Sequence, residues 1–572
     1  MSRRNGSGVR ASVSVIFATM VALTSGCGQP EVETETPVAG GALDAPVAVT
    51  GGEVQGAPAV GNPDIVLFQG VPYAAPPVGD LRWQPPQPVV AWDGVRDATA
   101  PGPMCVQAGP AFARAPTTTA DDPESEDCLL LNIWAPRPTE EPLPVMVWVH
   151  GGGFFNGESS LPLYEGTGLA ERDVVVVTIN YRLNVFGFMA HPALSAESPH
   201  GASGNYGLMD VVAALEWVRD NISAFGGDPS QVTLFGESAG GGAVMSVMLM
   251  PQSEGLFQRA ISESTWVYGW DRGLSEPVGD WDSAEAQGVR VAESLGATGD
   301  TALATLRAAS AAAVQEAANA NMGNLLTRTE YIWAPNVDGW TIPSDPLAMY
   351  AAGLQHDVPL ITGMNAGEGA SIAVRSGVDD AASFESHVRT VYAAAADEIL
   401  AEYDVTSPDT AMAQVAHLVT DMYFAGPVRA QVAAHTQVSS PVWLYQFSRV
   451  PPTALGTIVG AAYHGGEVAY VFDTMDDGPA PTGAPPHPMA THGAWTETDR
   501  QLSETMMAYW TQFAATGNPN RADLPEWPEF DLATDHYLDL GDTLSTGEGL
   551  HQAGERLFKA FETGRRAETS AP

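Results

Sequence analysis

The chain has 572 residues, of which 45% are hydrophobic and 16% charged, and this composition excludes a disordered protein and a small disulfide-stabilised domain. Asp and Glu number 68 against 25 Lys and Arg, which gives a formal net charge of −43. Such a field repels phosphate backbones and anionic membrane surfaces, so a nucleic-acid partner is excluded. The charge indicates a solvated acidic surface; steering of cationic substrates is the alternative.

Residues 1–26 have the pattern of an export signal. Three arginines precede an uncharged run over residues 11–23, which is shorter than the roughly 20 apolar residues that cross a bilayer. The run ends in Leu-Thr-Ser-Gly-Cys, which resembles a bacterial lipobox and predicts lipid on Cys27. An ordinary cleaved signal peptide with an incidental cysteine is the alternative. We therefore expect an exported protein, anchored in the cell envelope through Cys27 or otherwise periplasmic or secreted.

The segment after this signal predicts a tether followed by one folded domain. Residues 27–46 are mostly Glu, Thr, Pro, Gly and Ala without apolar periodicity, a composition typical of a disordered tether. No later linker or internal repeat interrupts the chain before a short polar tail. We therefore expect a single domain over residues 47–566.

The cysteines predict one disulfide. If Cys27 carries lipid, Cys105 and Cys128 are the pair that remains, and an exported protein meets an oxidising compartment. A disulfide between them would close a surface loop and stabilise the fold by roughly 3 kcal/mol. No His and Cys cluster has the spacing of a zinc site, so neither a metal nor a cofactor is expected.

A nucleophilic serine is predicted at Ser238. Residues 231–235 read Gln-Val-Thr-Leu-Phe, typical of a buried parallel strand, and they run into Gly236-Glu237-Ser238-Ala239-Gly240 followed by small, helix-compatible residues. This is the G-x-S-x-G motif in its strand, turn and helix setting. The glycines permit a sharp turn, and the helix N-terminus beside Ser238 favours a developing oxyanion.

A second glycine motif predicts the oxyanion hole. The apolar residues 145–149 form a strand pattern that ends in His150-Gly151-Gly152-Gly153-Phe154, a loop of the HGGG type whose backbone N–H groups can face a tetrahedral oxygen. We assign the hole to the N–H groups of Gly152, Gly153 and Ala239. His150 is interpreted as a structural hydrogen-bonding residue and not as the catalytic base.

Further segments around these motifs carry a family resemblance. In chain order they are residues 68–74, 76–79, 81–82, 126–132, 204–208, 225–229, Trp510, 513–514 and 516–519. From about Val47 to Phe530 the chain resembles the type-B carboxylesterases, the cholinesterase-like branch of the α/β-hydrolase fold. The resemblance implies an α/β fold with a mixed, mostly parallel central sheet flanked by helices.

The resemblance also implies the remaining triad members, which follow in the order Ser, acid, His. Residues 360–369 match the segment that carries the family's acid and place Glu368 there. His464-Gly465-Gly466-Glu467 matches the family's His-Gly-x-Glu segment and makes His464 the base. His435 has no such setting, and His492 lacks the glutamate three residues later.

A supporting hydrogen bond is expected beneath the base. Ser264 matches a buried serine of the family, and we expect it to bond to Glu467 under His464. Ordinary surface polarity of both residues is the alternative.

The predicted function is hydrolysis of small-molecule carboxylic esters through an acyl-enzyme, with His464 as proton carrier and Glu368 fixing its tautomer. In cholinesterases, a tryptophan in the disulfide loop holds the quaternary ammonium. Here Phe112 is the only aromatic residue between the two cysteines, which favours uncharged esters. Trp266, Tyr268 and Trp270 follow the family's acyl-side position and line a pocket or belong to the core.

Two other functions stay open at this point. The family includes non-catalytic adhesion and hormone-precursor relatives, which typically lack triad members. The same groups could also hydrolyse an amide, a carbamate or a lactone. The sequence leaves the natural ester, its chain length and the oligomeric state open.

Overall fold

A computed structural model describes residues 43–107, 123–137, 141–265, 272–278, 281–321, 333–374, 376–477 and 490–569. All of them lie in one structural unit, Ala39–Pro572. The predicted signal, Cys27, most of the predicted tether, Phe112 and the three aromatic residues Trp266, Tyr268 and Trp270 lie outside the described residues.

Strands with apolar, β-branched sequences build the centre of this unit. They are β3 (Ala57–Ala59), β4 (Asn62–Pro72), β8 (Leu130–Pro136), β9 (Leu143–Val149), β10 (Val175–Ile179), β11 (Gly227–Glu237), β12 (Arg259–Glu263), β13 (Leu360–Asn365), β14 (Val442–Phe447), β15 (His536–Leu540) and β16 (Ser545–Glu548). Two smaller sheets contain β1 (Val47–Val49), β2 (Gly52–Gln55) and β5 (Val95–Asp97), and β6 (Met104–Cys105) with β7 (Glu124–Ser125).

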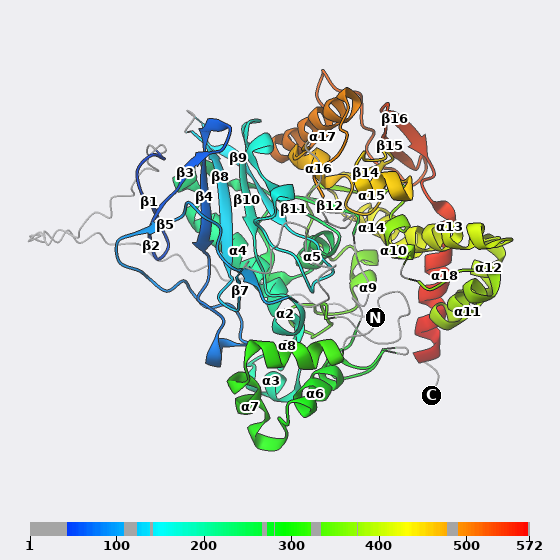
Figure 1. The fold of residues 1–572 in the computed structure, drawn as a ribbon, viewed down its shortest axis with the longest axis horizontal. Helices are drawn as coiled ribbons and strands as arrows, with labels where there is room; N and C mark the ends of the chain where they lie inside the picture. The colour runs from blue at the N-terminus through cyan, green and yellow to red at the C-terminus, as the bar shows by residue number, and fades with distance from the viewer. Residues whose placement is uncertain are drawn as a thin grey trace, which may run out of the picture. The chain divides into compact units, whose positions relative to one another are not determined.

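Within the described ranges, eleven strands form one sheet in the order β16-β15-β14-β13-β12-β11-β9-β10-β8-β4-β3 (Figure 1). The strands from β15 to β10 in this order are parallel to one another. Strand β16 at one edge and β8, β4 and β3 at the other are antiparallel to their neighbours. The mixed, mostly parallel sheet predicted from the sequence is therefore confirmed.

Helices surround the sheet. They are α1 (Thr167–Ala170), α2 (Asn184–Phe188), α3 (Pro192–Glu197), α4 (Tyr206–Asn221), α5 (Ala239–Val247), α6 (Ala284–Ser294), α7 (Ala302–Ala308), α8 (Ala311–Ala320), α9 (Pro346–Ala351), α10 (Ala370–Ala373), α11 (Ala381–Val391), α12 (Ala396–Glu402), α13 (Pro408–Val419), α14 (Gly426–His435), α15 (Ala454–Val459), α16 (Val468–Phe472), α17 (Glu497–Thr516) and α18 (Gln552–Thr569). None of those in the described ranges is long and apolar enough to cross a membrane.

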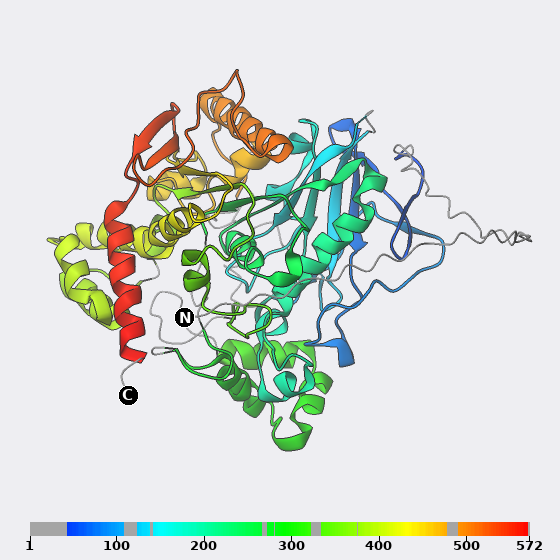
Figure 2. The same cartoon turned by 180° about the vertical axis from the view of Figure 1, so that it is seen from behind.

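Both faces of the sheet are buried. Successive side chains of a strand point to opposite faces, so each strand contributes apolar residues to both of them. In β9, Val145, Val147 and Val149 join a hydrophobic cluster with α4 and α5, whereas Met146 and Trp148 join a second cluster with α16 and α17. The arrangement can be followed from both sides in Figures 1 and 2. The carboxyl ends of β9, β11 and β13 therefore meet at one edge of a rigid, two-sided core.

The folded region extends past both predicted boundaries. Leu43 is 1% exposed and packs in the main hydrophobic cluster, and Asp44 pairs with Arg137 at 2.8 Å. At the other end, α18 continues to Thr569. A single buried leucine in a Gly and Ala stretch carries no periodicity, so no sequence pattern marks the start of the folded region there.

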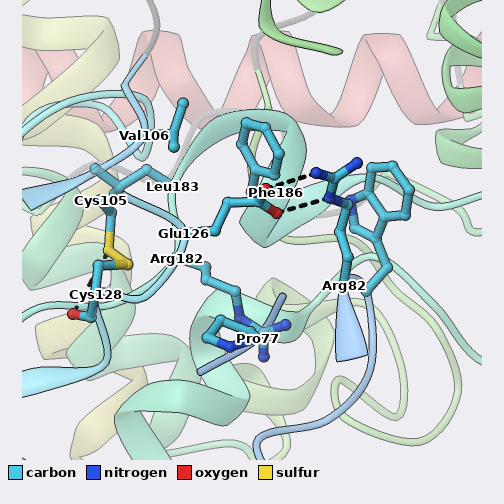
Figure 3. A pocket seen from close by; sticks show the side chains of 10 residues that line it. Pro77, Arg82, Cys105, Val106, Glu126, Cys128, Arg182, Leu183 and Phe186 are labelled. Carbon is cyan, nitrogen blue, oxygen red and sulfur yellow. Dashed lines mark hydrogen bonds and ion pairs between the residues drawn. A yellow bond between two sulfur atoms is a disulfide. The ribbon is translucent and has the colours of Figure 1, made fainter. Parts of the chain in front are cut away.

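Cys105 and Cys128 form a disulfide, the pair that the sequence predicts. A small pocket beside it contains Arg82 and Glu126, whose paired hydrogen bonds measure 2.7 and 2.6 Å (Figure 3). Arg182, which also lines this pocket, makes a buried pair with Asp210 at 2.7 Å. Paired in this way, the buried charges of these two arginines and two carboxylates are satisfied.

Candidate active site

Ser238 lies on a sharp turn between β11 and α5. Its φ of 58° and ψ of −122° are strained for a residue with a side chain, and its N–H donates to the carbonyl of Glu263 on β12 at 2.9 Å. A Cβ at Gly240 would lie 2.0 Å from the carbonyl oxygen of Val149. Only glycine permits this contact between the start of α5 and the end of β9. The last glycine of the motif therefore fixes the turn.

Two distant segments bring a histidine and a glutamate to this turn. His464, which follows α15, places its Nε2 2.8 Å from Ser238 Oγ. Its Nδ1 lies 2.6 Å from Oε2 of Glu368, and the other oxygen of Glu368 accepts the N–H of Asn365 at 2.8 Å. The structure thus joins the three residues that the sequence predicts as a triad into one hydrogen-bonded chain.

A further carboxylate, Glu237, lies against the same histidine. Its Oε1 is 3.3 Å from His464 Nε2, and burial raises its pKa to about 8, with Glu467 and Glu368 adding to the rise and His464 opposing it. Burial alone lowers the pKa of His464, but Glu237, Glu368 and Glu467 outweigh it and raise that pKa to about 9. The charge of Glu237 and the charge of the imidazole therefore each shift the pKa of the other group.

The expected bond beneath His464 is present. Ser264 Oγ donates to Oε1 of Glu467 at 3.1 Å, and both side chains are fully buried. The amide of Asn365 donates to the other oxygen of Glu467 and to the carbonyl of Tyr463, the latter at 2.8 Å. Burial raises the pKa of Glu467 to about 7. The hydrogen bonds of Asn365 connect strand β13, which precedes Glu368, to the loop that carries His464.

The glycine motif after β9 lies directly over the serine. A Cβ on Gly151 would come within 3.1 Å of Ser238 Cβ, and Gly152 and Gly153 have φ angles of 105° and 65°. Within the described ranges, neither of these two residues donates its N–H to another protein group. Ala239 is the first residue of α5, where an N–H has no acceptor inside the helix.

The other histidines named above occupy structural settings. His150 is 1% exposed, its Nδ1 lies 2.8 Å from the carbonyl of Gly151, and burial lowers its pKa to about 4. His435 bonds to the carbonyl of Val358 at 3.1 Å, and burial likewise lowers its pKa to about 4. His492 pairs with Asp476 at 3.0 Å. None of these contacts of the three described histidines reaches Ser238.

Two neighbours of His464 were not predicted. Glu237 is part of the serine motif, but the motif does not indicate that its side chain returns to the histidine. Phe424, in a π-helical turn over Thr420–Ala425, packs its ring against the imidazole with the ring centroids 4.6 Å apart and the planes tilted by 44°, and no local pattern marks it. Among the residues that the structure describes, no group of acidic, His and Cys side chains could hold a metal ion.

Comparison with known proteins decides the family. The model of the Carboxylesterase family matches residues 44–557. The chain belongs to the carboxylesterase family.

Curated members of this family align with most of the chain. It is 36% identical over 490 residues to "Fumonisin B1 esterase" of Sphingopyxis macrogoltabida, covering 85% of each chain. It is 34% identical over 487 residues to "Para-nitrobenzyl esterase" of Bacillus subtilis, covering 84% of this chain and 91% of the relative. A solved "PNB esterase" structure superposes with a TM-score of 0.74 at 31% identity, over 90% of this chain and 99% of that one.

These comparisons confirm the α/β-hydrolase fold and the class of reaction that the sequence predicts. The protein is a carboxylic ester hydrolase whose family acts on small-molecule esters.

Proposed function

We propose that the protein hydrolyses uncharged carboxylic esters with Ser238 as nucleophile, His464 as base and Glu368 as orienting acid. The observation that carries this assignment is the hydrogen-bonded chain from Glu368 through His464 to Ser238, with distances of 2.6 and 2.8 Å. Nucleophile, base and orienting group in this order are what acyl transfer through a serine requires.

The geometry gives each group one task. A serine hydroxyl is a poor nucleophile, so His464 Nε2 removes its proton as Oγ attacks the ester carbonyl. The same proton then passes to the leaving alcohol, which leaves an acyl group on Ser238. Water repeats the sequence and releases the carboxylic acid. The carboxylate of Glu368 accepts the hydrogen bond from Nδ1 and stabilises the imidazolium of each step.

The N–H groups of Gly152, Gly153 and Ala239 are proposed to bind the oxyanion of each tetrahedral intermediate. Their support is the position of the glycine loop over Ser238, the N–H groups of Gly152 and Gly153, which donate to no group in the described part of the chain, and the start of α5 at Ala239. Donors fixed before the reaction stabilise developing charge without reorganising, and each contributes about 10²- to 10³-fold to kcat in comparable sites.

Covalent labelling tests the proposed nucleophile. A fluorophosphonate loses fluoride when a serine alkoxide attacks its phosphorus, so the phosphonyl group should appear by mass spectrometry on the peptide that contains Ser238. His464→Ala should slow this labelling strongly, because the alkoxide then lacks its base. Rapid esterase turnover without label on Ser238 would reject the assignment. Absence of both turnover and label would instead favour a binding protein on the same fold.

The pH profile should report on Glu237. With its carboxylate beside Nε2, Glu237 holds the pKa of His464 up, and the histidine is a base only when neutral. Glu237→Gln removes that charge, so the acid limb of kcat/KM should move to lower pH by roughly one unit. Glu216→Gln, an exposed change on α4, should leave the limb in place. A limb that stays or moves upward in Glu237→Gln would contradict this coupling.

Substrate charge should have little effect. Phe112 is the only aromatic residue between the disulfide cysteines, so this loop offers no tryptophan face to a quaternary ammonium. Surface charge is screened over about 10 Å at 0.1 M salt. A choline ester and its tert-butyl isostere should therefore differ in kcat/KM by less than about tenfold, or about 1.4 kcal/mol. A larger, salt-insensitive preference for choline would reveal a desolvated cation site.

We further propose that the protein is an exported lipoprotein anchored through Cys27. The supporting observation is the arginine-led apolar run that ends in Leu-Thr-Ser-Gly-Cys. The native protein should fractionate with membranes, because a diacylglyceryl group supplies the two chains that stable anchoring needs. Cys27→Ser should block processing or release soluble enzyme. A soluble native chain whose unmodified N-terminus lies beyond Cys27 would contradict the anchor.

A further inference from the structure

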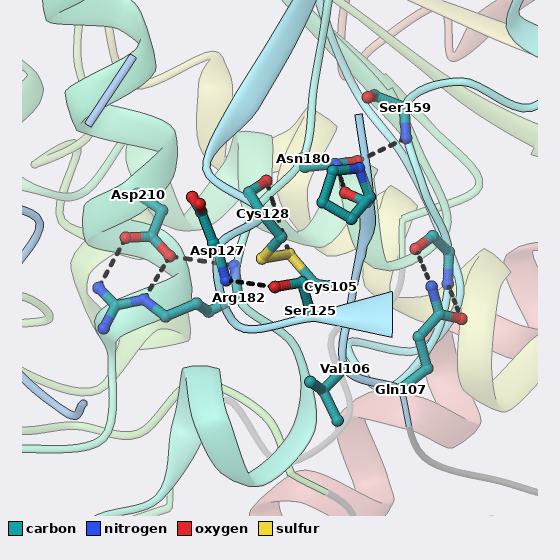
Figure 4. Close-up of a disulfide and its surroundings, with 12 residues drawn as sticks. Cys105, Val106, Gln107, Ser125, Asp127, Cys128, Ser159, Asn180, Arg182 and Asp210 are labelled. Carbon is teal, nitrogen blue, oxygen red and sulfur yellow. Dashed lines mark hydrogen bonds and ion pairs between the residues drawn. A yellow bond between two sulfur atoms is a disulfide. The ribbon is translucent and has the colours of Figure 1, made fainter. Parts of the chain in front are cut away.

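Hydrogen bonds from three amide residues connect the segment around Cys105 to the loop that lies over Ser238. We call residues 103–107 the cysteine segment and residues 151–159 the glycine loop. Three residues, Gln107, Asn180 and Asn184, each connect one to the other, the first two through their side chains (Figure 4) and Asn184 through its side chain on one side and its backbone N–H on the other. The cysteine segment is thus the support on which the glycine loop rests.

Gln107 makes the most direct of these connections. Its Nε2 donates to the carbonyl of Gly157 at 2.6 Å, and the N–H of Gly157 donates to its Oε1 at 3.2 Å. The residue is 7% exposed. The backbone N–H and C=O of one residue, Gly157, are therefore both bonded to one planar amide, a two-point contact that fixes orientation as well as distance.

The two asparagines act at either side of this contact. Asn184 donates from Nδ2 to the carbonyl of Val106 at 2.7 Å, and its N–H donates to the carbonyl of Phe154 at 2.7 Å. Asn180 donates to the carbonyl of Pro103 at 3.3 Å and accepts the N–H of Ser159 at 2.8 Å. The loop is therefore held to the cysteine segment at Phe154, Gly157 and Ser159.

Gly157 transmits this support toward the serine. Its φ is 117°, and a Cβ there would lie 2.3 Å from Nδ1 of His150 and 2.6 Å from the carbonyl oxygen of Gly151. The backbone of Gly157, to which Gln107 is hydrogen-bonded, is thus packed against the start of the glycine loop. Asn156 N–H, one residue earlier, donates to the carbonyl of Gly152 at 3.1 Å, and this bond connects the backbone beside Gly157 to Gly152.

We propose that Gln107 is a positioning residue for the oxyanion hole, and that the disulfide at Cys105 anchors it. The amide of Gln107 does not touch substrate. It fixes Gly157 and through it the N–H groups of Gly152 and Gly153 at the place where the oxyanion forms. This inference rests on the hole proposed above. A displacement of about 1 Å at a reacting centre costs on the order of 10²-fold in rate.

The test compares Gln107→Ala and Gln107→Met with wild type. Methionine keeps the length of glutamine but offers neither hydrogen bond, so both variants should lose about 10- to 100-fold in kcat with KM changed less than threefold. Gln87→Ala, an exposed glutamine whose amide bonds only to neighbouring carbonyls, is the matched control and should keep the wild-type kcat.

A transition-state analogue separates positioning from mere stability. Ser238 Oγ adds to the carbonyl of a trifluoromethyl ketone, and the hemiketal oxygen occupies the proposed hole. Across the Gln107 variants, the inhibition constant of this ketone should rise in proportion to the loss of kcat/KM. The melting temperatures of the variants should not show this proportion. Wild-type kcat in Gln107→Met would overturn the inference, whether or not Gln107→Ala folds, because packing alone would then suffice.

Failure of this inference is distinguishable from failure of the proposed function. If Ser238→Ala is inactive while both Gln107 variants react normally, the serine mechanism stands and the role of Gln107 is wrong. If Ser238→Ala keeps its activity, the proposed mechanism itself is wrong.

Discussion

Ser238→Ala is expected to lower kcat/KM by on the order of 10⁴-fold or more and to leave the fold intact. Removal of Oγ abolishes the acyl-enzyme, and the residual rate comes from the hole and from binding alone. The substituted residue keeps its Cβ, so the contacts of the turn persist. Hydrolysis of an activated ester, measured with circular dichroism and melting temperature on the same preparation, checks the result.

His464→Ala should cause a similar loss, and the double variant should be little worse than either single variant. Serine and histidine act as a unit, so their effects are not additive. Ser294→Ala, an exposed serine at the end of α6, controls for the substitution itself. Near-normal turnover by a clean preparation of Ser238→Ala would show that another residue is the nucleophile.

The parts of the site that the sequence predicts are those that local geometry dictates. The second half of β11 is buried and mostly apolar, the turn after it needs glycine where a Cβ would meet the Val149 carbonyl, and the helix that follows needs small residues. These requirements fall within one short stretch of chain, so they leave a readable pattern. The family resemblance extended that pattern to Glu368 and His464, whose loops are far away in sequence.

The parts that the sequence does not predict depend on contacts between distant segments. Gln107 meets Gly157 across 50 positions, and Phe424 reaches His464 from a π-helical turn. Neither residue has a spacing or a neighbour that marks it, because its partner is chosen by tertiary packing. The return of Glu237 to His464 is missed for the same reason, although Glu237 lies inside the motif.

Glu368→Gln is expected to lower kcat by about 10⁴-fold. Oε2 of Glu368 faces His464 Nδ1, while Oε1 accepts the N–H of Asn365. A glutamine must direct its NH₂ group at one of these two positions. Directed at Nδ1, it favours the tautomer with the proton on Nε2, which cannot accept a proton from Ser238. Directed at Asn365, it places two donors against each other in a buried site. Steady-state kinetics and the melting temperature measure both costs.

The matched control is Glu467→Gln, the same chemical change in the same buried cluster. Glu467 accepts from Ser264 Oγ and from Asn365 Nδ2, and a glutamine can satisfy both, since its oxygen accepts from Asn365 and its NH₂ donates to the serine hydroxyl. The loss in kcat should therefore stay within about tenfold. Equal losses in the two variants would mean that the cluster's total charge, and not the bond from Glu368 to Nδ1, keeps His464 competent. If only Glu368→Gln causes a large loss, Glu368 acts by fixing the tautomer of the His464 imidazole.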